Sequence, residues 1–252
     1  MRTTEFDDAR LEDPDLVDDE QLRRLAEAGA RIRRACLSEP LGRLERADRP
    51  RGVLVLGAEA RLVRAVLEPT CPVPFLAWPG PALPAWVGPL DLVVVLGGHE
   101  AQGWEIACAQ EAARRGATMI VAAPATSQLA AAGASRTTTL IPMAEGDAMA
   151  SAVAVLEQLG LLELCPPVNP GHVADAADLV AESCSPLREV GSNPAKDLAL
   201  GLAEALPLVW GGTTLAGRAS RRIADCTRCR RRRRAPRPGS ARTCRSTRAW
   251  GT

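Results

Sequence analysis

Residues 53–57 read VLVLG, and residues 91–98 read DLVVVLGG. Each is an apolar, valine-rich run that is too short for a helix and ends in glycine, which is typical of a buried strand followed by a loop. Segments with helical spacing follow them, ARLVRAVLE from residue 60 and AQGWEIACAQEAARRG from residue 101. Buried strands that alternate with amphipathic helices predict a parallel sheet covered on both faces.

The alternation continues toward both ends of the chain. Further strands are predicted at residues 73–78, 118–124 and 137–142, and further helices at residues 18–37, 126–132 and 147–162. Connections between parallel strands are right-handed, so the simplest topology is a doubly wound layer sandwich. The predicted fold class is therefore α/β with a doubly wound parallel sheet.

Changes of composition divide the chain into four predicted parts. The segment CPPVNPG at 165–171 sustains neither helix nor strand and is interpreted as a linker. Beyond it, two helices and a short strand at 207–211 indicate the start of a second α/β unit. The parts are an N-terminal helical segment (1–49), the first α/β domain (50–165), the linker with an incomplete second unit (166–224), and a tail (225–252).

The tail differs in composition from the rest of the chain. It contains no Leu, Ile, Val, Met or Phe, and it holds 10 of the 31 basic residues, so we expect it to be disordered. Such a string is typical of a GC-rich coding region read out of frame, and we expect a frameshift near codon 224. The alternative is a tail that binds nucleic acid or acidic lipid without specificity and with steep salt dependence.

Other partners are excluded on composition. Residues 1–224 carry a formal charge of −8, and the chain has no Tyr and only two Phe, so no specific nucleic-acid partner is expected. The sequence shows neither a secretory leader nor an apolar run of about 18 residues, which predicts a cytoplasmic protein with no membrane partner.

No cofactor or metal site is predicted either. The loop after residue 57 has one glycine where a dinucleotide fingerprint needs three. Cys226 and Cys229 have the inner spacing of a zinc site, but Cys244 is the only later cysteine and no histidine follows. The remaining five cysteines are interpreted as reduced, buried residues.

One segment carries a family resemblance. Residues 193–212, NPAKDLALGLAEALPLVWGG, resemble the start of the second SIS (sugar isomerase) domain of the bifunctional phosphoglucose/phosphomannose isomerases. As a pattern of elements the resemblance covers residues 50–224. It implies SIS-type flavodoxin-like layers, a glucose 6-phosphate/mannose 6-phosphate isomerase-like activity and binding of a carbohydrate derivative.

The sequence departs from that family at its phosphate loops. The loops LGAEARL (56–62) and LGGHEAQG (96–103) lack the family's hydroxyls, and Glu59 and Glu100 oppose a dianion. Loop amides at helix starts still suit an anion, so the predicted substrate-binding residues are the following: Gly57, Gly97, Gly98 and His99.

The resemblance also implies a loss of catalysis. Asp147 stands approximately where the family has an active-site arginine, and we expect it to cap a helix. The family's catalytic Glu and His lie beyond the end of this chain. No catalytic residue is therefore predicted, and the chain is interpreted as a degenerate, C-terminally truncated and inactive family member.

Three alternatives remain open. The chain is an isomerase-family protein, a non-catalytic module that binds a sugar phosphate or a protein partner, or an anion-binding protein that acts through its tail. A homodimer is compatible with the first two. His99 is alternatively an exposed loop histidine, and His172 is interpreted as a residue of a helix N-terminus.

Overall fold

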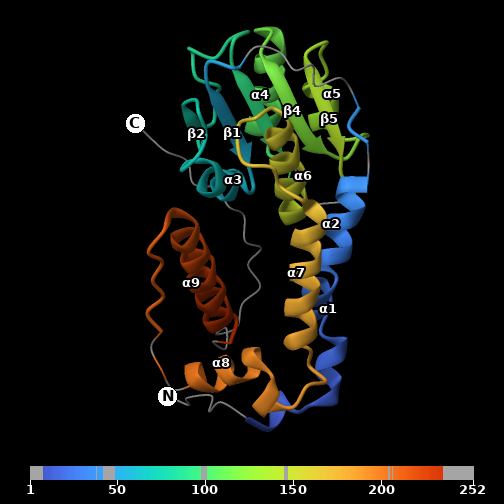
Figure 1. Ribbon diagram of the computed structural model, residues 1–252, viewed down its shortest axis with the longest axis vertical. Coiled ribbons are helices and arrows are strands. Elements are labelled where there is room, and N and C mark those ends of the chain that lie inside the picture. The colour runs from blue at the N-terminus through green and yellow to red at the C-terminus, as the bar shows by residue number, and fades with distance from the viewer. Residues whose placement is uncertain are drawn as a thin grey trace, which may run out of the picture. The chain divides into compact units, whose positions relative to one another are not determined.

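The computed structural model describes residues 8–37, 39–41, 49–97, 101–144, 147–203, 205 and 207–234. Contacts divide the chain into two compact units, Met1–Pro207 and Leu208–Thr252. Unit 1 contains the sheet and most of the helices (Figure 1). The boundary that the composition suggests at residue 165 lies within unit 1 and stays a prediction.

The sheet of unit 1 has five parallel strands in the order β2-β1-β3-β4-β5. Three of them, β1, β3 and β4, are buried almost throughout, as their continuous apolar runs predict. The α/β class with a doubly wound parallel sheet is thus confirmed. The strands are β1 (Val53–Gly57), β2 (Phe75–Ala77), β3 (Leu92–Leu96), β4 (Thr118–Ala123) and β5 (Thr138–Pro142).

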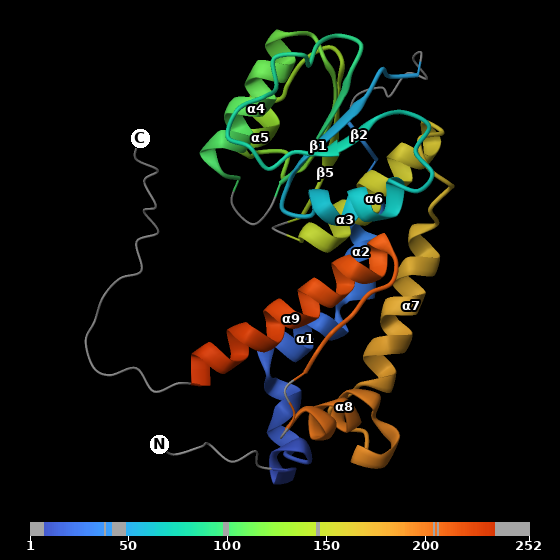
Figure 2. The ribbon, with the colours of Figure 1, turned by 90° about the vertical axis from the view of Figure 1, so that its left-hand side faces the viewer.

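Helices cover both faces of the sheet (Figure 2). Alternate residues of β1 point to opposite cores: Val53 and Val55 pack with α2, α3 and α6, whereas Leu54 and Leu56 pack with α4 and α5. The helices of unit 1 are α1 (Glu20–Ala26), α2 (Ala28–Leu37), α3 (Ala60–Leu67), α4 (Gly103–Arg114), α5 (Gln128–Ala132), α6 (Ala148–Leu161), α7 (Pro170–Ser183) and α8 (Pro194–Ala203), with short 3-10 turns at Asp8–Leu11, Pro14–Asp18 and Val190–Ser192.

Helix α7 packs along α2, which ties the segment beyond the predicted linker to unit 1 (Figure 1). A Cβ atom at Gly29 would lie 2.6 Å from the carbonyl oxygen of Ala174, so only glycine allows this approach. Arg33 of α2 forms ion pairs with Asp175 and Asp178 of α7, both at 2.6 Å. The linker sequence follows the end of α6, and the helix after it packs against α2 and α6.

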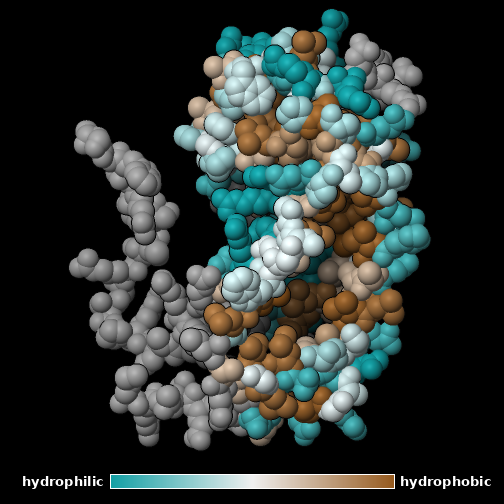
Figure 3. Space-filling model, turned by 60° about the vertical axis from the view of Figure 1, so that its left-hand side comes forward, coloured by the Kyte–Doolittle hydropathy of each residue, from teal (hydrophilic) through white to brown (hydrophobic). Residues whose placement is uncertain are grey.

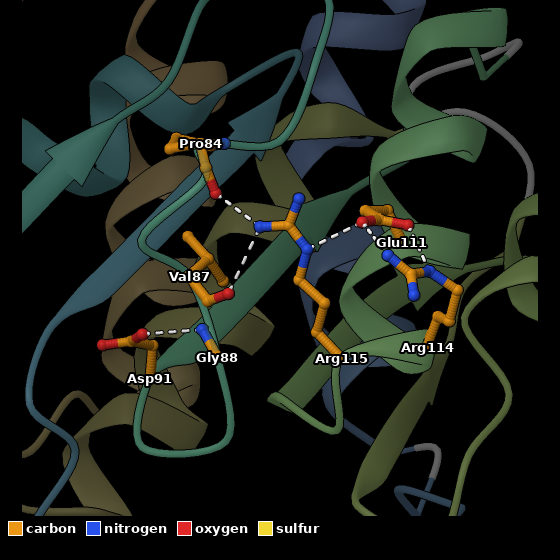
Figure 4. Close-up of polar contacts among 7 residues, drawn as sticks. All are labelled: Pro84, Val87, Gly88, Asp91, Glu111, Arg114 and Arg115. Carbon is orange, nitrogen blue, oxygen red and sulfur yellow. Dashed lines mark hydrogen bonds and ion pairs between the residues drawn. The ribbon is translucent and has the colours of Figure 1, made fainter.

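A long loop between β2 and β3 is held by two arginines at the amino edge of the sheet. Arg51 donates to both oxygens of the buried Asp91, which also accepts the amide of Gly88. Arg115 donates to the carbonyl oxygens of Pro84 and Val87 (Figure 4). The loop carries Leu83 and Val87 into the core beside α4.

The ion pairs of Glu111 with Arg114 and Arg115 make the stability of this region depend on pH. Hydrogen bonds from Arg114 and then Arg115 lower the pKa of Glu111 from 4.5 to about 2. A carboxylate whose pKa is lower in the folded than in the unfolded state stabilises the fold above the unfolded value, and this stabilisation is lost as the pH falls toward the folded value.

We therefore expect Glu111→Gln to lower the free energy of unfolding at pH 6. The difference from the parent protein should shrink as the pH falls below about 4.5 and should be absent near pH 2. The loss of stability is modest because the Glu111 side chain and its arginine partners are partly exposed to solvent. Urea unfolding across this pH range measures it, with Glu39→Gln as the control at an exposed carboxylate outside the cluster. A difference that persists at pH 2 would contradict the mechanism.

Unit 2 departs from the sequence-based expectation. The predicted strand at 207–211 is irregular, and within the described part of the chain no strand pairs with it; an isolated strand without a ladder is not stable. Helix α9 (Thr214–Arg234) continues into the segment expected to be disordered from residue 225. Arginine is a good helix former, which favours a helix through the arginine-rich residues up to Arg234. Residues 235–252 lie outside the described residues.

Candidate functional site

The strand order places a reversal point between β1 and β3. From β1 the chain first adds β2 on one side and then adds β3, β4 and β5 on the other. Loops that leave the carboxyl ends of such neighbouring strands diverge, and ligands of doubly wound sheets bind in the crevice between them. We call this position the switch point and define it by the segments that follow β1 and β3, residues 57–59 and 97–102.

Two of the predicted binding residues meet at the switch point. Gly57 pairs with Leu96 in the β1–β3 register, so Gly57 and Gly97 occupy neighbouring positions at the carboxyl edge. Gly98 and His99, together with Glu100, lie outside the described residues. The prediction that these four residues form one anion site stays a prediction.

Both described glycines have a packing role. Gly57 has a φ of 107°, and a Cβ atom there would lie 2.0 Å from the carbonyl oxygen of Leu96. The amide of Gly97 donates to the carbonyl oxygen of Ala122 at 2.8 Å. That amide belongs to the sheet ladder, so amides for an anion would have to come from the residues after Gly97 or from the loop after β1.

Two buried carboxyl groups lie in the first turns of the helices that start at the switch point. Glu59, 6% exposed, is the N-cap residue of α3 but makes no side-chain cap bond. Glu105 of α4 accepts the amide of Gln102 at 2.8 Å, and burial raises its pKa. The burial of Glu59 was not foreseen from the sequence. It strengthens the expectation that the Glu59 carboxylate repels a dianion at this place.

Farther along the same edge, polar side chains cap the next two helices. Ser127, after β4, accepts the amide of Ala130, and Asp147, after β5, accepts the amides of Met149 and Ala150. The expectation that Asp147 caps a helix is confirmed. An ion pair between Arg31 of α2 and Asp147 was missed, because the two residues lie far apart in the sequence.

The NPAK segment, which carries the family resemblance, has a structural task here. Asn193 accepts the amides of Ala195 and Lys196 and donates to the carbonyl oxygen of Ser185, so it caps α8. Lys196 is buried, and its Nζ donates to the carbonyl oxygens of Pro186 and Arg188 at 2.8 and 2.7 Å. These contacts fix the turn between α7 and α8.

The five cysteines up to Cys184 are free thiols, as expected, although only two of them are buried. Burial, reinforced by the charge of Glu157, raises the pKa of Cys36 to about 11. Burial also raises the pKa of Cys108 and Cys165. Thiols held in the neutral form are poor nucleophiles and poor metal ligands.

The described residues lack two further features. No cluster of three or more His, Cys, Asp or Glu side chains is arranged to hold a metal ion in this part of the chain. None of its helices combines the length and the apolar character that a membrane span requires.

Comparisons with known proteins find likeness only among solved structures. No protein-family model and no curated protein matches the chain. A provisionally assigned phosphosugar isomerase from Silicibacter pomeroyi DSS-3 is similar with a TM-score of 0.45 and 18% identity, over 77% of this chain and 59% of that one. A second, from Bacillus subtilis, has a TM-score of 0.38 and 12% identity, over 64% and 49%. The chain thus spans about half to three fifths of the length of these structures.

Proposed function

We propose that the chain is an SIS-type phosphosugar-isomerase-like protein that binds a sugar phosphate at the switch point without isomerising it. The strand order β2-β1-β3-β4-β5 carries this proposal, because it brings the loops after β1 and β3 to the position where doubly wound folds bind ligands. The sugar-phosphate class comes from the resemblance of residues 193–212 to glucose 6-phosphate/mannose 6-phosphate isomerases.

The local chemistry supports weak binding. Helices α3 and α4 begin directly after the two loops, and helix starts attract anions through their amides and dipole. Glu59 and Glu105 oppose a dianion at the same place, so a phosphate there is held less well than in a loop rich in hydroxyls. The bound anion would contact Gly57, Gly97, Gly98 and His99.

The same chemistry supports binding without turnover. Isomerisation through an ene-diol needs a base that carries a proton between two carbons. Of the acidic side chains described at the switch point, Glu105 is occupied by the amide of Gln102, and Glu59 is buried against the start of α3. We therefore assign neither side chain the role of the base.

A protein-interaction module, as a homodimer or with another partner, is the second candidate. Helix α7 and the turn after it expose Leu179, Val180 and Leu187 to more than 60%. Figure 3 shows apolar surface in the lower half of the view, where α7 and α8 lie. Exposed apolar clusters of this kind are typical of protein contact sites.

Titration of the full chain with fructose 6-phosphate, glucose 6-phosphate and mannose 6-phosphate tests the proposal. We expect a ligand-dependent rise of the melting temperature that the double variant Gly98→Val/His99→Ala abolishes, and no isomerase activity above background. An unchanged shift in the double variant would place the ligand elsewhere. Turnover near the usual enzyme value of about 10 per second would contradict the non-catalytic assignment.

A further inference from the structure

Helix α9 of unit 2 carries a high density of positive charge. Its 21 residues include nine arginines and one acidic residue, Asp225, which give it a formal charge of +8. Six of the nine arginines lie in residues 228–234, which read RCRRRRR. We call these seven residues the arginine segment. The helix runs unbroken through the segment to Arg234 (Figure 2), so the rise of the helix sets the spacing of these charges along its axis.

The charge spacing of the arginine segment is close to that of a nucleic-acid duplex. An α-helix rises about 1.5 Å per residue, so seven residues cover roughly 10 Å and six charges follow one another at about 1.7 Å. Double-stranded DNA carries one negative charge per about 1.7 Å of its axis. A polyanion of this density can neutralise the segment along its whole length, which a single small anion cannot do.

Unit 2 has no matching negative charge of its own. Its 45 residues contain 13 arginines and one acidic residue, Asp225, so its formal charge is +12 whichever arginine Asp225 pairs with. Like charges three or four positions apart on a helix repel, as at Arg228, Arg231 and Arg232. A bound polyanion would relieve this repulsion. Residues 1–207 carry 18 basic and 29 acidic residues, a charge of −11, and repel a polyanion, which confines its binding to unit 2.

The residue types of α9 favour nucleic acid over a membrane. A helix that lies on a membrane buries a continuous apolar face among the lipids. The large apolar residues of α9 are Leu215 and Ile223, and the chain after Ile223 contains no Leu, Ile, Val, Met or Phe. The most strongly charged half of the helix therefore has no apolar face to insert.

The shape and composition of α9 favour duplex DNA among nucleic acids. Proteins bind single strands by stacking bases on aromatic side chains, and α9 contains no Phe, Tyr or Trp. An α-helix is about 10–12 Å across and fits the major groove of B-form DNA, which is about 12 Å wide. The major groove of A-form RNA is too deep and narrow for side chains to read. Guanidinium groups bind phosphate oxygens through parallel N–H···O bonds. We propose that α9 binds double-stranded DNA without sequence preference, through the phosphates and the arginine segment.

Titration of a short fluorescent DNA duplex with the full chain, followed by anisotropy, tests this proposal. We expect a dissociation constant of about 1–100 µM at physiological salt. It should rise by about three orders of magnitude between about 50 and 200 mM salt, because about six neutralised phosphates release their counter-ions. Duplexes of A·T and of G·C pairs should bind within about tenfold of each other, since no base edge is read.

Paired variants separate the charge of the arginine segment from the fold. Arg228→Gln/Arg232→Gln removes two charges from one face of α9 and hardly changes helix propensity. It should weaken binding at least about tenfold and lower the slope of the salt dependence by about two. Arg228→Lys/Arg232→Lys keeps both charges and should bind within about threefold of the parent. The control Arg61→Gln/Arg136→Gln removes two exposed charges from unit 1 and should have as small an effect.

Several results would overturn the proposal. One is that the full chain binds no duplex at about 0.1 mM protein and low salt. Another is that the lysine variant binds as weakly as the glutamine variant, or that the unit 1 control weakens binding equally, while circular dichroism shows each variant to be folded. Tighter binding of single-stranded DNA, of an RNA duplex or of vesicles of anionic lipid would also contradict the assignment to duplex DNA.

Discussion

Replacing Gly57 by alanine should lower the free energy of unfolding by about 2–6 kcal/mol. A Cβ atom at this position would lie 2.0 Å from the carbonyl oxygen and 2.8 Å from the carbonyl carbon of Leu96, both backbone atoms of a central strand. The φ of 107° adds strain for any residue with a Cβ. Strained backbone and overpacking cost about 1–3 kcal/mol each, a large part of a typical stability of about 5–15 kcal/mol.

Gly103→Ala is the matched control for Gly57→Ala. Gly103 is the first residue of α4, near the same carboxyl edge, and a Cβ atom there meets nothing within 4 Å. Alanine also has the higher helix propensity, so this variant should be as stable as the parent or more stable. Urea unfolding followed by circular dichroism compares them. Equal midpoints for the two variants would show that β1 and β3 do not approach as closely as the structure indicates.

The strands at the centre of the fold were predictable because each is a local pattern. VLVLG and LVVVL are apolar on both faces, and the structure buries them in two separate cores. The helix caps at Asp147 and Asn193 were also readable, since a cap is a contact between residues two or three positions apart. At these positions the local sequence pattern alone determines the element that the structure contains.

The failures concern contacts between residues that are distant in the sequence. The single helix predicted over 18–37 is two helices that meet at Glu27, and α2 then packs against α7 through Gly29. Nothing in the local pattern indicates that Gly29 meets Ala174. For the same reason the linker sequence at 165–171 does not indicate that the helix after it packs against α2.

At the candidate sites, too, local features were predictable and contacts between distant residues were not. The pattern placed Gly57 and Gly97 at one edge of the sheet, because the carboxyl ends of parallel strands meet there. The ion pair between Arg31 and Asp147 was not predictable, since it joins residues more than a hundred positions apart in the sequence. A charged residue on a helix is by itself indistinguishable from a solvated one.

The segment around residues 198–210 should make the protein self-associate. Leu208 and Trp210 are 84% and 89% exposed, and Leu198 on α8 is 59% exposed. Burial of a large apolar side chain contributes about 1.5–3 kcal/mol. Covering Leu208 and Trp210 in a contact between molecules therefore offers about 3–6 kcal/mol, which is at least a hundredfold in an association constant.

The double variant Leu208→Ser/Trp210→Ser should weaken this association on the order of a hundredfold or more and raise solubility. Leu90→Ser is the control, because Leu90 is 69% exposed but lies in the loop before β3. Sedimentation velocity and light scattering over a range of concentrations compare the three proteins. If the parent chain is monomeric throughout and its amides near residue 209 are protected from exchange, the apolar segment is covered within the chain and the prediction is wrong. If Leu90→Ser dissociates the protein as effectively, the association comes from general surface hydrophobicity and not from this segment.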